Sequence, residues 1–272
     1  MSRATVAAAA LLVVVAQSAS ARADDAPPAE GTHASPTELV VAQGLERPAL
    51  QAGVVRGRDV ILARGFEVEL ARVLARRLGA RVERFVYVPS QPRLLASSGA
   101  AWQLAFDGID AGRAGRTAAD LSTPYLTTDV AVVARRGLSR PRRLVDLRST
   151  VLCAVRSTDA AGAMSAVRPS RRPLLSGGVE RLRSLLRTGA CDAALVPAVE
   201  AGRFVAGQRA SIGTVVGRVA SGGGIVLAVP RGTGLDAARV DRELGRLRRD
   251  GTLGRLSRTW LGLDPATLPV LR

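Results

Sequence analysis

The sequence predicts an α/β fold built in two lobes, and three observations carry this prediction. Short apolar runs suited to buried strands alternate with segments whose apolar residues recur at helical spacing. The alternation begins at Glu38, and the same order restarts near Val130. The chain has 272 residues and 47% hydrophobic content, enough for one large or two medium packed domains. We therefore expect each lobe to hold a mixed, mostly parallel sheet flanked by helices.

The first part of the folded chain reads as strand, helix, strand, helix, strand. The clearest helix places Phe66, Leu70 and Leu74 on one face and stops at Gly79. We expect strands at residues 39–42, 81–88 and 104–106, and helices at 66–78 and around 94–95. This order predicts parallel strands joined by helices.

The second part repeats the alternation. We expect strands at residues 130–134, 151–155, 193–196 and 225–229, and helices at 158–167, 179–187, 236–249 and 253–261. Turn-rich segments near Thr127 and Gly223 are the natural crossing points between the lobes.

The N-terminus has the layout of a cleavable secretory signal. Arg3 precedes an apolar run over residues 4–16, and a small-residue site ends at Ala23. The run is shorter than the ~20 residues that a membrane span needs. We expect a signal peptide over 1–23, a flexible Pro- and Ala-rich leader over 24–36, and a periplasmic or secreted protein after cleavage near Ala23.

Histidine and cysteine usage excludes several kinds of site. The single histidine, His33, lies in the leader, so neither a zinc cluster nor a Ser-His-Asp site is available to the folded part. We expect no metal and no cofactor. Cys153 and Cys191 form an even pair in an exported chain, which favours a disulfide, with two buried free thiols as the alternative.

The formal net charge is +16, carried by arginine without any lysine. Many of these arginines fall on the polar faces of expected helices, which indicates a solvated surface. Export argues against a nucleic-acid partner. Weak attraction to anionic lipid or to an acidic protein stays open.

The stretch GIDAGRAGRTAADLSTPY, Gly108 to Tyr125, is not a nucleotide cradle. Its Gly-Arg-Thr imitates the end of a phosphate-binding loop, but Asp110 stands where the first glycine belongs. A carboxylate there would repel phosphate.

Several segments together resemble the periplasmic solute-binding proteins of polar amino-acid uptake systems, solute-binding family 3. They are ELVVAQG, ARGFEVELARVLARRLGARVE, DLSTPYLTTDVAVVARRG, VDLRSTVLCAVRST, GACDAALV and VDRELGRLRRDGTLGRLSRTWLG, in the family's usual order. The resemblance implies the two-lobed type II periplasmic-binding-protein fold.

The resemblance further implies the lobes and their task. The first lobe would comprise residues 37–125 and 224–272, the second 126–223, with hinges near 127 and 223. A small polar solute would bind between the lobes, and the permease of an ABC transporter would read the closed form. This task needs no enzymatic step, and we expect a monomer.

Some binding positions of the family are altered in this chain. Aligned without gaps, Asp110 takes the place of a ligand-binding threonine, and Gly115 that of the arginine that clamps the ligand carboxylate, with Arg116 one place later. Either Arg116 clamps the ligand or the clamp is lost. Pro197 replaces the acidic residue that holds the amino group, and GLERPALQAG lacks the usual aromatic residue.

Other binding positions are kept. Tyr125 remains at the hinge side of the cleft, and Arg156, Ser157 and Thr158 lie at a strand-to-helix turn where the family holds a carboxylate. The alternative for Thr158 is a simple helix N-cap.

These changes predict a ligand other than a standard α-amino acid. A charged amine or carboxylate buried without a partner costs several kcal/mol, whereas Asp107, Asp110 and Glu46 favour a cationic or hydroxyl-rich solute. One alternative is an accessory protein that acts through a partner such as a quinoprotein dehydrogenase. Another is an enzyme similar to cyclohexadienyl dehydratase, with Glu200 as the acid.

Overall fold

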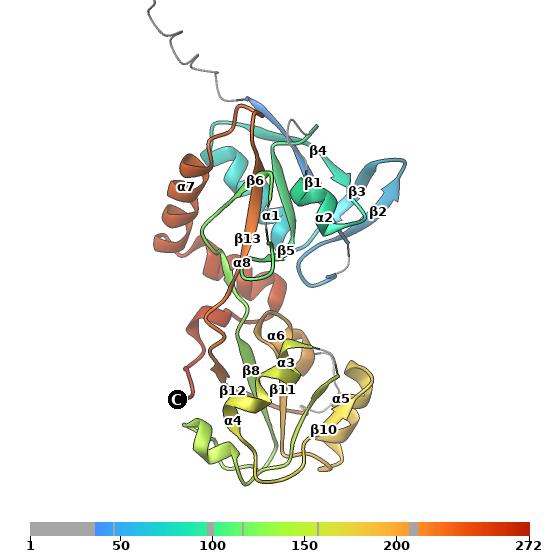
Figure 1. The fold of residues 1–272 in the computed structure, drawn as a ribbon, viewed down its shortest axis with the longest axis vertical. Coiled ribbons are helices and arrows are strands. Elements are labelled where there is room, and N and C mark those ends of the chain that lie inside the picture. The colour runs from blue at the N-terminus through green and yellow to red at the C-terminus, as the bar shows by residue number, and fades with distance from the viewer. Residues whose placement is uncertain (1–35, 46, 97–100, 116, 157, 207–211) are drawn as a thin grey trace, which may run out of the picture. The chain divides into compact units, whose positions relative to one another are not determined.

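The computed structural model describes residues 36–272 apart from 46, 97–100, 116, 157 and 207–211 (Figure 1). The expected signal peptide, most of the leader, His33, Glu46, Arg116 and Ser157 lie outside the described residues. No helix in the described part is both long enough and apolar enough to cross a membrane.

The first sheet has eight strands in the order β2-β3-β4-β1-β5-β13-β6, with β7 also paired to β13. Its strands are β1 (Glu38–Gln43), β2 (Ala52–Arg56), β3 (Asp59–Arg64), β4 (Arg81–Tyr87), β5 (Leu104–Asp110), β6 (Ala119–Leu121), β7 (Leu126–Thr127) and β13 (Gly224–Pro230). Strand β1 runs parallel to both β4 and β5, as the sequence predicts for strands joined by helices.

The second sheet has five strands in the order β10-β9-β11-β8-β12. They are β8 (Val130–Arg135), β9 (Leu152–Val155), β10 (Leu174–Ser176), β11 (Ala193–Pro197) and β12 (Gly213–Val219). Strands β9, β10 and β11 are mutually parallel, while β8 is antiparallel to both β11 and β12. The predicted mixed, two-sheet α/β architecture is therefore confirmed.

Helices cover both sheets. They are α1 (Phe66–Arg77), α2 (Gln91–Ala96), α3 (Asp159–Gly162), α4 (Met164–Val167), α5 (Val179–Arg187), α6 (Ala198–Val205), α7 (Ala237–Arg249) and α8 (Thr252–Leu261), with 3₁₀ turns η1 (Leu144–Leu147) and η2 (Pro265–Thr267). The expected helix over 158–167 is divided into α3 and α4 at Ala163, directly after Gly162, a poor helix former.

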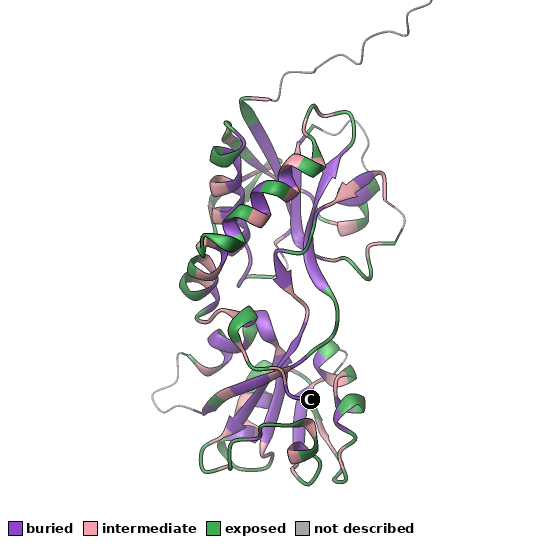
Figure 2. Ribbon diagram, turned by 90° about the vertical axis from the view of Figure 1, so that its left-hand side faces the viewer, coloured by how far each residue is buried: buried purple, intermediate pink, exposed green. Residues whose placement is uncertain are grey.

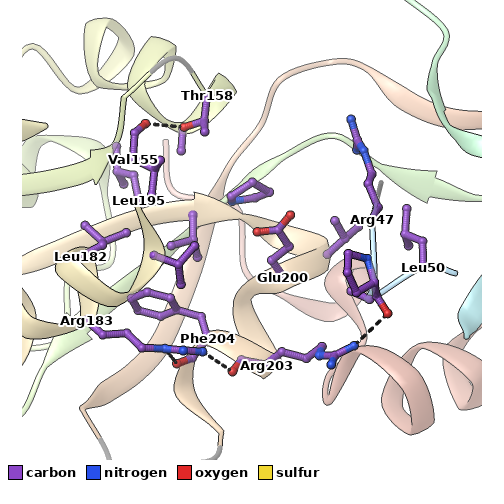
Figure 3. Close-up of a pocket in the computed structure, with 17 residues that line it drawn as sticks. Arg47, Leu50, Val155, Thr158, Leu182, Arg183, Leu195, Glu200, Arg203 and Phe204 are labelled. Atoms are coloured by element: carbon purple, nitrogen blue, oxygen red, sulfur yellow. Dashed lines mark hydrogen bonds between the residues drawn. The ribbon is translucent and has the colours of Figure 1, made fainter. Parts of the chain in front are cut away.

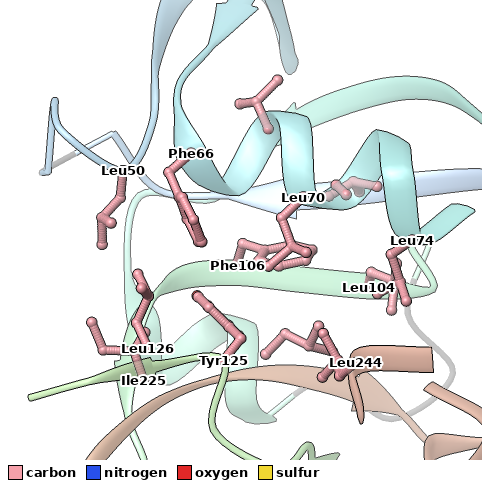
Figure 4. Packing of buried hydrophobic residues seen from close by; sticks show 14 of the residues in the cluster. Leu50, Phe66, Leu70, Leu74, Leu104, Phe106, Tyr125, Leu126, Ile225 and Leu244 are labelled. Atoms are coloured by element: carbon pink, nitrogen blue, oxygen red, sulfur yellow. The ribbon is translucent and has the colours of Figure 1, made fainter. Parts of the chain in front are cut away.

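The cores follow the sequence pattern. The apolar face of α1 packs on the first sheet, where Phe66, Leu70 and Leu74 are fully buried beside Phe106 (Figure 4). Buried residues follow the strands of both sheets, and exposed ones gather on the outer faces of the helices (Figure 2). The second sheet has apolar clusters of its own, and one of them contains the disulfide between Cys153 and Cys191, with Cα atoms 6.0 Å apart.

Strand β5 is longer than the sequence indicates. It continues past Phe106 to Asp110 because it pairs antiparallel with β13, where Asp110 lies opposite Ile225. The residues Gly108 to Asp110 are therefore strand rather than loop.

Two segments connect strands of one sheet to strands of the other, one between β7 and β8 and one between β12 and β13. Asp129 ties them together, because its carboxylate accepts a 2.8 Å hydrogen bond from the Ser221 N–H and forms an ion pair with Arg218. The Thr128 and Ser221 hydroxyls are also hydrogen-bonded, at 2.8 Å.

The C-terminal residues differ from the expectation that 224–272 belong wholly to the first lobe. Val270 forms a β-bridge with Arg218, and Leu271 is buried in an apolar cluster of the second sheet. The reason is apolar burial, since the chain after α8 carries leucines that cover this sheet.

Candidate functional site

A cavity of about 340 Å³ is lined by residues from both sheets and their helices (Figure 3). One wall is the segment Arg47 to Leu50 that follows β1. The opposite wall is built from the second sheet, where β11 ends at Pro197 and α6 begins. The lining is mostly apolar, with Thr158, Glu200 and three arginines as its polar members.

The first wall depends on a glycine. Backbone N–H groups of Leu50 and Gln51 both donate to the Arg47 carbonyl at 2.9 Å, which folds the segment into a turn. The turn rests on Gly108, where an added Cβ would lie 2.8 Å from Arg47 Cδ and 3.0 Å from Leu50 Cδ1. Gly108 also has φ of 55°, a conformation that favours glycine. A side chain at Gly108 would therefore push Arg47 and Leu50 from their positions in the cavity wall.

The second wall carries the acidic group. Glu200 lies on α6, and its carboxylate has no hydrogen bond or ion pair to the residues that the structure describes. Burial raises the pKa of Glu200, while the charges of Arg47 and Arg203 act to lower it. The side chain stays accessible to solvent from the cavity although protein surrounds much of it. A solute in the cavity would meet this carboxylate directly.

Arg203 connects the two walls. Its guanidinium donates a 3.1 Å hydrogen bond to the Pro48 carbonyl, as Figure 3 shows. Arg183 is occupied on the second wall, where it donates to the Phe204 and Arg203 carbonyls and lies over the Phe204 ring. The Arg47 guanidinium forms no hydrogen bond or ion pair with the described residues, which leaves it available to a ligand oxygen.

A buried polar cluster lies beneath the first wall. Glu67, in the first turn of α1, accepts hydrogen bonds at Oε1 from the Tyr125 hydroxyl (2.5 Å) and the Gly108 N–H (2.9 Å). Burial is the main cause that raises the pKa of Glu67 to about 7, and the two hydrogen bonds oppose it. Nearby, Gln51 donates a 3.0 Å hydrogen bond to Asp107.

Of the predicted site residues that the structure describes, one lies at the cavity. Thr158 lines it, and its hydroxyl donates to the Val155 carbonyl at 2.7 Å; at the N-cap position of α3 it makes no side-chain cap bond. Tyr125 is buried between Phe66 and Phe106. Asp110 lines another hollow beside Arg113, and Arg156 an open one beside β10. Arg116 and Ser157 are not among the described residues.

Sequence reasoning missed Arg47, Arg203 and Glu67. Glu67 carried a detectable signal, because it shares a helix face with the buried Ala71 and Leu74, where a charged residue is unexpected. The arginines carried none, since arginine is spread along the whole chain.

The described residues contain no group of three or more histidine, cysteine or acidic side chains placed to hold a metal ion. Pro197 lines the cavity at the position where the resemblance places an amine-binding acid. The site therefore offers one carboxylate, one available guanidinium and an apolar surface.

Comparison with known proteins agrees with this architecture. The unliganded, open L-cystine solute receptor of Neisseria gonorrhoeae aligns with a TM-score of 0.67 at 18% identity, covering 85% of this chain and 95% of the receptor. Substrate-binding domain 2 of GlnP from Lactococcus lactis, in its open conformation, gives a TM-score of 0.65 at 15% identity, covering 84% and 97%.

A third solved structure is the ancestral amino acid-binding protein AncCDT-1, described as a precursor of cyclohexadienyl dehydratase. It gives a TM-score of 0.52 at 20% identity, covering 83% of this chain and 95% of that one. These structures share the two-lobed type II periplasmic-binding fold. A sequence search of curated proteins finds no match. Residues 61–263 match the bacterial extracellular solute-binding proteins, family 3, and the chain belongs to this family.

Proposed function

We propose that the chain captures a small polar solute in the cavity between Arg47 and Glu200 and delivers it to the membrane permease of an ABC transporter. The observation that carries the proposal is the composition of the cavity, whose walls come from both sheets. A solute held there touches both lobes at once, so its binding favours an arrangement in which the two walls are close.

The proposed lobes follow the two sheets. The first comprises β1 to β7, β13 and helices α1, α2, α7 and α8; the second comprises β8 to β12, helices α3 to α6 and the last residues of the chain. Closure would bend the two joining segments, near Thr127 and Gly223, where few residues absorb the backbone change. Solute affinity that differs between open and closed forms is sufficient to drive it.

The proposed ligand is not a standard α-amino acid. Pro197 supplies neither charge nor an N–H to an ammonium group, and Gly115 is exposed with open space around it. A zwitterion would lose several kcal/mol at each end that it buries without a partner. A cationic or hydroxyl-rich solute with an oxygen acceptor suits Glu200 and Arg47, and an apolar body suits Leu50 and Phe204.

We propose that the mature protein is a periplasmic monomer released by cleavage near Ala23. The support is the N-terminal pattern of Arg3, an apolar run and a small-residue site, together with the extracellular character of the family.

A calorimetric panel of L-amino acids, polyamines, small hydroxy acids and sugar acids tests the proposal. We expect a polyamine or a hydroxyl-rich compound to bind with a heat that is lost in Glu200→Gln. Tight binding of an ordinary L-amino acid would overturn the ligand class, and no binding across the panel would count against solute capture.

A second candidate is an elimination reaction in the same cavity. One observation favours it: the Glu200 carboxyl group has a raised pKa and no hydrogen-bond or ion-pair partner among the described residues, which suits proton donation to a leaving hydroxyl group. Incubation with prephenate and arogenate tests it, because loss of the starting compound in the wild type but not in Glu200→Gln is required. Unchanged substrate would exclude the reaction.

A further inference from the structure

The buried polar cluster around Glu67, beneath the first wall of the cavity, has no part in the proposed function. Glu67 is only 1% exposed. Its Oε1 accepts hydrogen bonds from two different parts of the first lobe, at Gly108 and at Tyr125. Gly108 belongs to β5 and lies under Arg47 and Leu50 of the cavity wall. Tyr125 lies directly before β7, the last strand before the chain crosses to the second sheet.

We propose that Glu67 is a positioning residue whose gain or loss of one proton changes how the cavity wall is aligned with the segment that crosses to the second sheet. The inference rests on the proposed function only in taking this cavity as the solute site. Glu67 touches no solute itself and acts through Gly108 and Tyr125.

The hydrogen bonds to Glu67 differ in strength between its two protonation states. An ionised Glu67 is an acceptor only, and both the Tyr125 hydroxyl and the Gly108 N–H donate to it. Hydrogen bonds to a charged group are shorter and stronger than those to a neutral one. Protonation therefore weakens the hold on both partners together.

The other carboxylate oxygen of Glu67 also responds to protonation. Glu67 Oε2 is buried and has no hydrogen-bond partner among the described residues, as is true of Gln51 Oε1. A proton on Oε2 turns that oxygen into a donor, and buried polar atoms without partners are costly. The two protonation states thus favour different local hydrogen bonding.

The charged and polar groups around Glu67 set which protonation state is favoured. The groups that face Glu67 are the Tyr125 hydroxyl before β7, the Asp107 carboxylate on β5 and the Arg47 guanidinium after β1. Asp107 opposes ionisation of Glu67, and Arg47 and the hydrogen bonds favour it. Burial outweighs them, so the pKa of Glu67 rises to about 7 and both states are populated near neutral pH.

The test measures the distance between the two sheets in the protein without any solute. Spin labels are placed at Val54→Cys on β2 and Leu175→Cys on β10, two exposed positions on different sheets. Double electron–electron resonance then records the distance distribution from pH 5.5 to 8.5. We expect a change with a midpoint near pH 7 in the otherwise native chain.

Three variants separate positioning from mere stability. Glu67→Gln should give one distribution at every pH, and Glu69→Gln, on the same helix but partly exposed and paired to Arg72, should keep the native midpoint. Tyr125→Phe removes a hydrogen bond that favours ionised Glu67, so the midpoint should move to higher pH. A loss of packing alone would not move a midpoint in this direction.

A flat profile in the native chain, a retained midpoint in Glu67→Gln or an unmoved midpoint in Tyr125→Phe would each overturn the inference. Because no solute is present, its failure is separate from that of the proposed function. A pH-dependent distance without solute binding would sink the proposed function alone, whereas solute binding without the transition would sink this inference alone.

Discussion

The Tyr125 hydroxyl donates a 2.5 Å hydrogen bond to Glu67 Oε1, which joins the first turn of α1 to the residue before β7. Tyr125 is itself buried, and its ring packs against Phe66 and Phe106 with centroids 6.0 and 5.9 Å away. This contact places a titratable carboxyl group between the cavity wall and the crossing to the second sheet.

Glu67 should make the stability of the protein depend on pH. Its pKa in the folded state, about 7, lies above the ordinary value of 4.5, so the folded protein binds more protons than the unfolded chain between these values. The free energy of unfolding should therefore fall as pH rises from 4.5 to 7, by roughly 3 kcal/mol in total.

Urea unfolding at pH 5 and pH 8 checks this prediction. Glu67→Gln should remove that part of the difference between the two pH values, and Glu69→Gln should keep it. Equal pH dependence in the native chain and in Glu67→Gln would contradict the assignment.

Asp129 should stabilise the junction between the sheets. Asp129→Asn keeps an acceptor for the Ser221 N–H but loses the ion pair with Arg218. We expect a loss of about 2 kcal/mol, less than for a fully buried pair because Arg218 is partly exposed.

Thermal or urea unfolding measures the effect of Asp129→Asn. The matched control is Asp120→Asn, which breaks an exposed pair with Arg231 and should cost less than about 1 kcal/mol. Equal losses in the two variants would argue against a special role of the junction.

The disulfide should stabilise the second sheet. It closes a loop with a sequence separation of 38 residues, which predicts a loss of about 4 kcal/mol in the Cys153→Ser/Cys191→Ser double variant. Urea unfolding of the oxidised chain and the double variant checks the value. Two free thiols in an Ellman titration of the unreduced, unfolded protein would show that the bond does not form in solution.

Glu200 should control solute binding with little effect on folding. Glu200→Gln keeps the shape of the side chain and removes its charge, so we expect a panel compound with a cationic group to bind at least about tenfold more weakly. Isothermal calorimetry measures the change. Glu83→Gln, an exposed position on β4, is the control and should bind as the native chain does.

The fold was largely predictable because the apolar periodicity and the turn residues of the sequence agree with the packing of the elements in the structure. Helix α5 has the expected bounds, and α1 ends within two residues of its predicted end, since apolar periodicity and a glycine stop coincide. The β2–β3 hairpin was missed because its strands expose residues such as Val54 and Leu62 and show no clean alternation.

The site was less predictable because it depends on which loops the fold brings together. Thr158 and Pro197 follow strands of the second sheet and could be placed near the ligand by analogy. Arg47 lies at the cavity next to Gly108, which is far away in the sequence and where a side chain would crowd it. Tyr125, by contrast, looked like a cleft residue and lies in the core, where its ring completes the packing of Phe66 and Phe106.

The most direct test of solute capture is a crystal structure of the chain with the tightest-binding panel compound. The account predicts that compound between Arg47 and Glu200, touching residues of both sheets and leaving Pro197 without a polar contact. A compound bound outside this cavity, or one whose amino and carboxylate groups are held as in an amino-acid receptor, would contradict it.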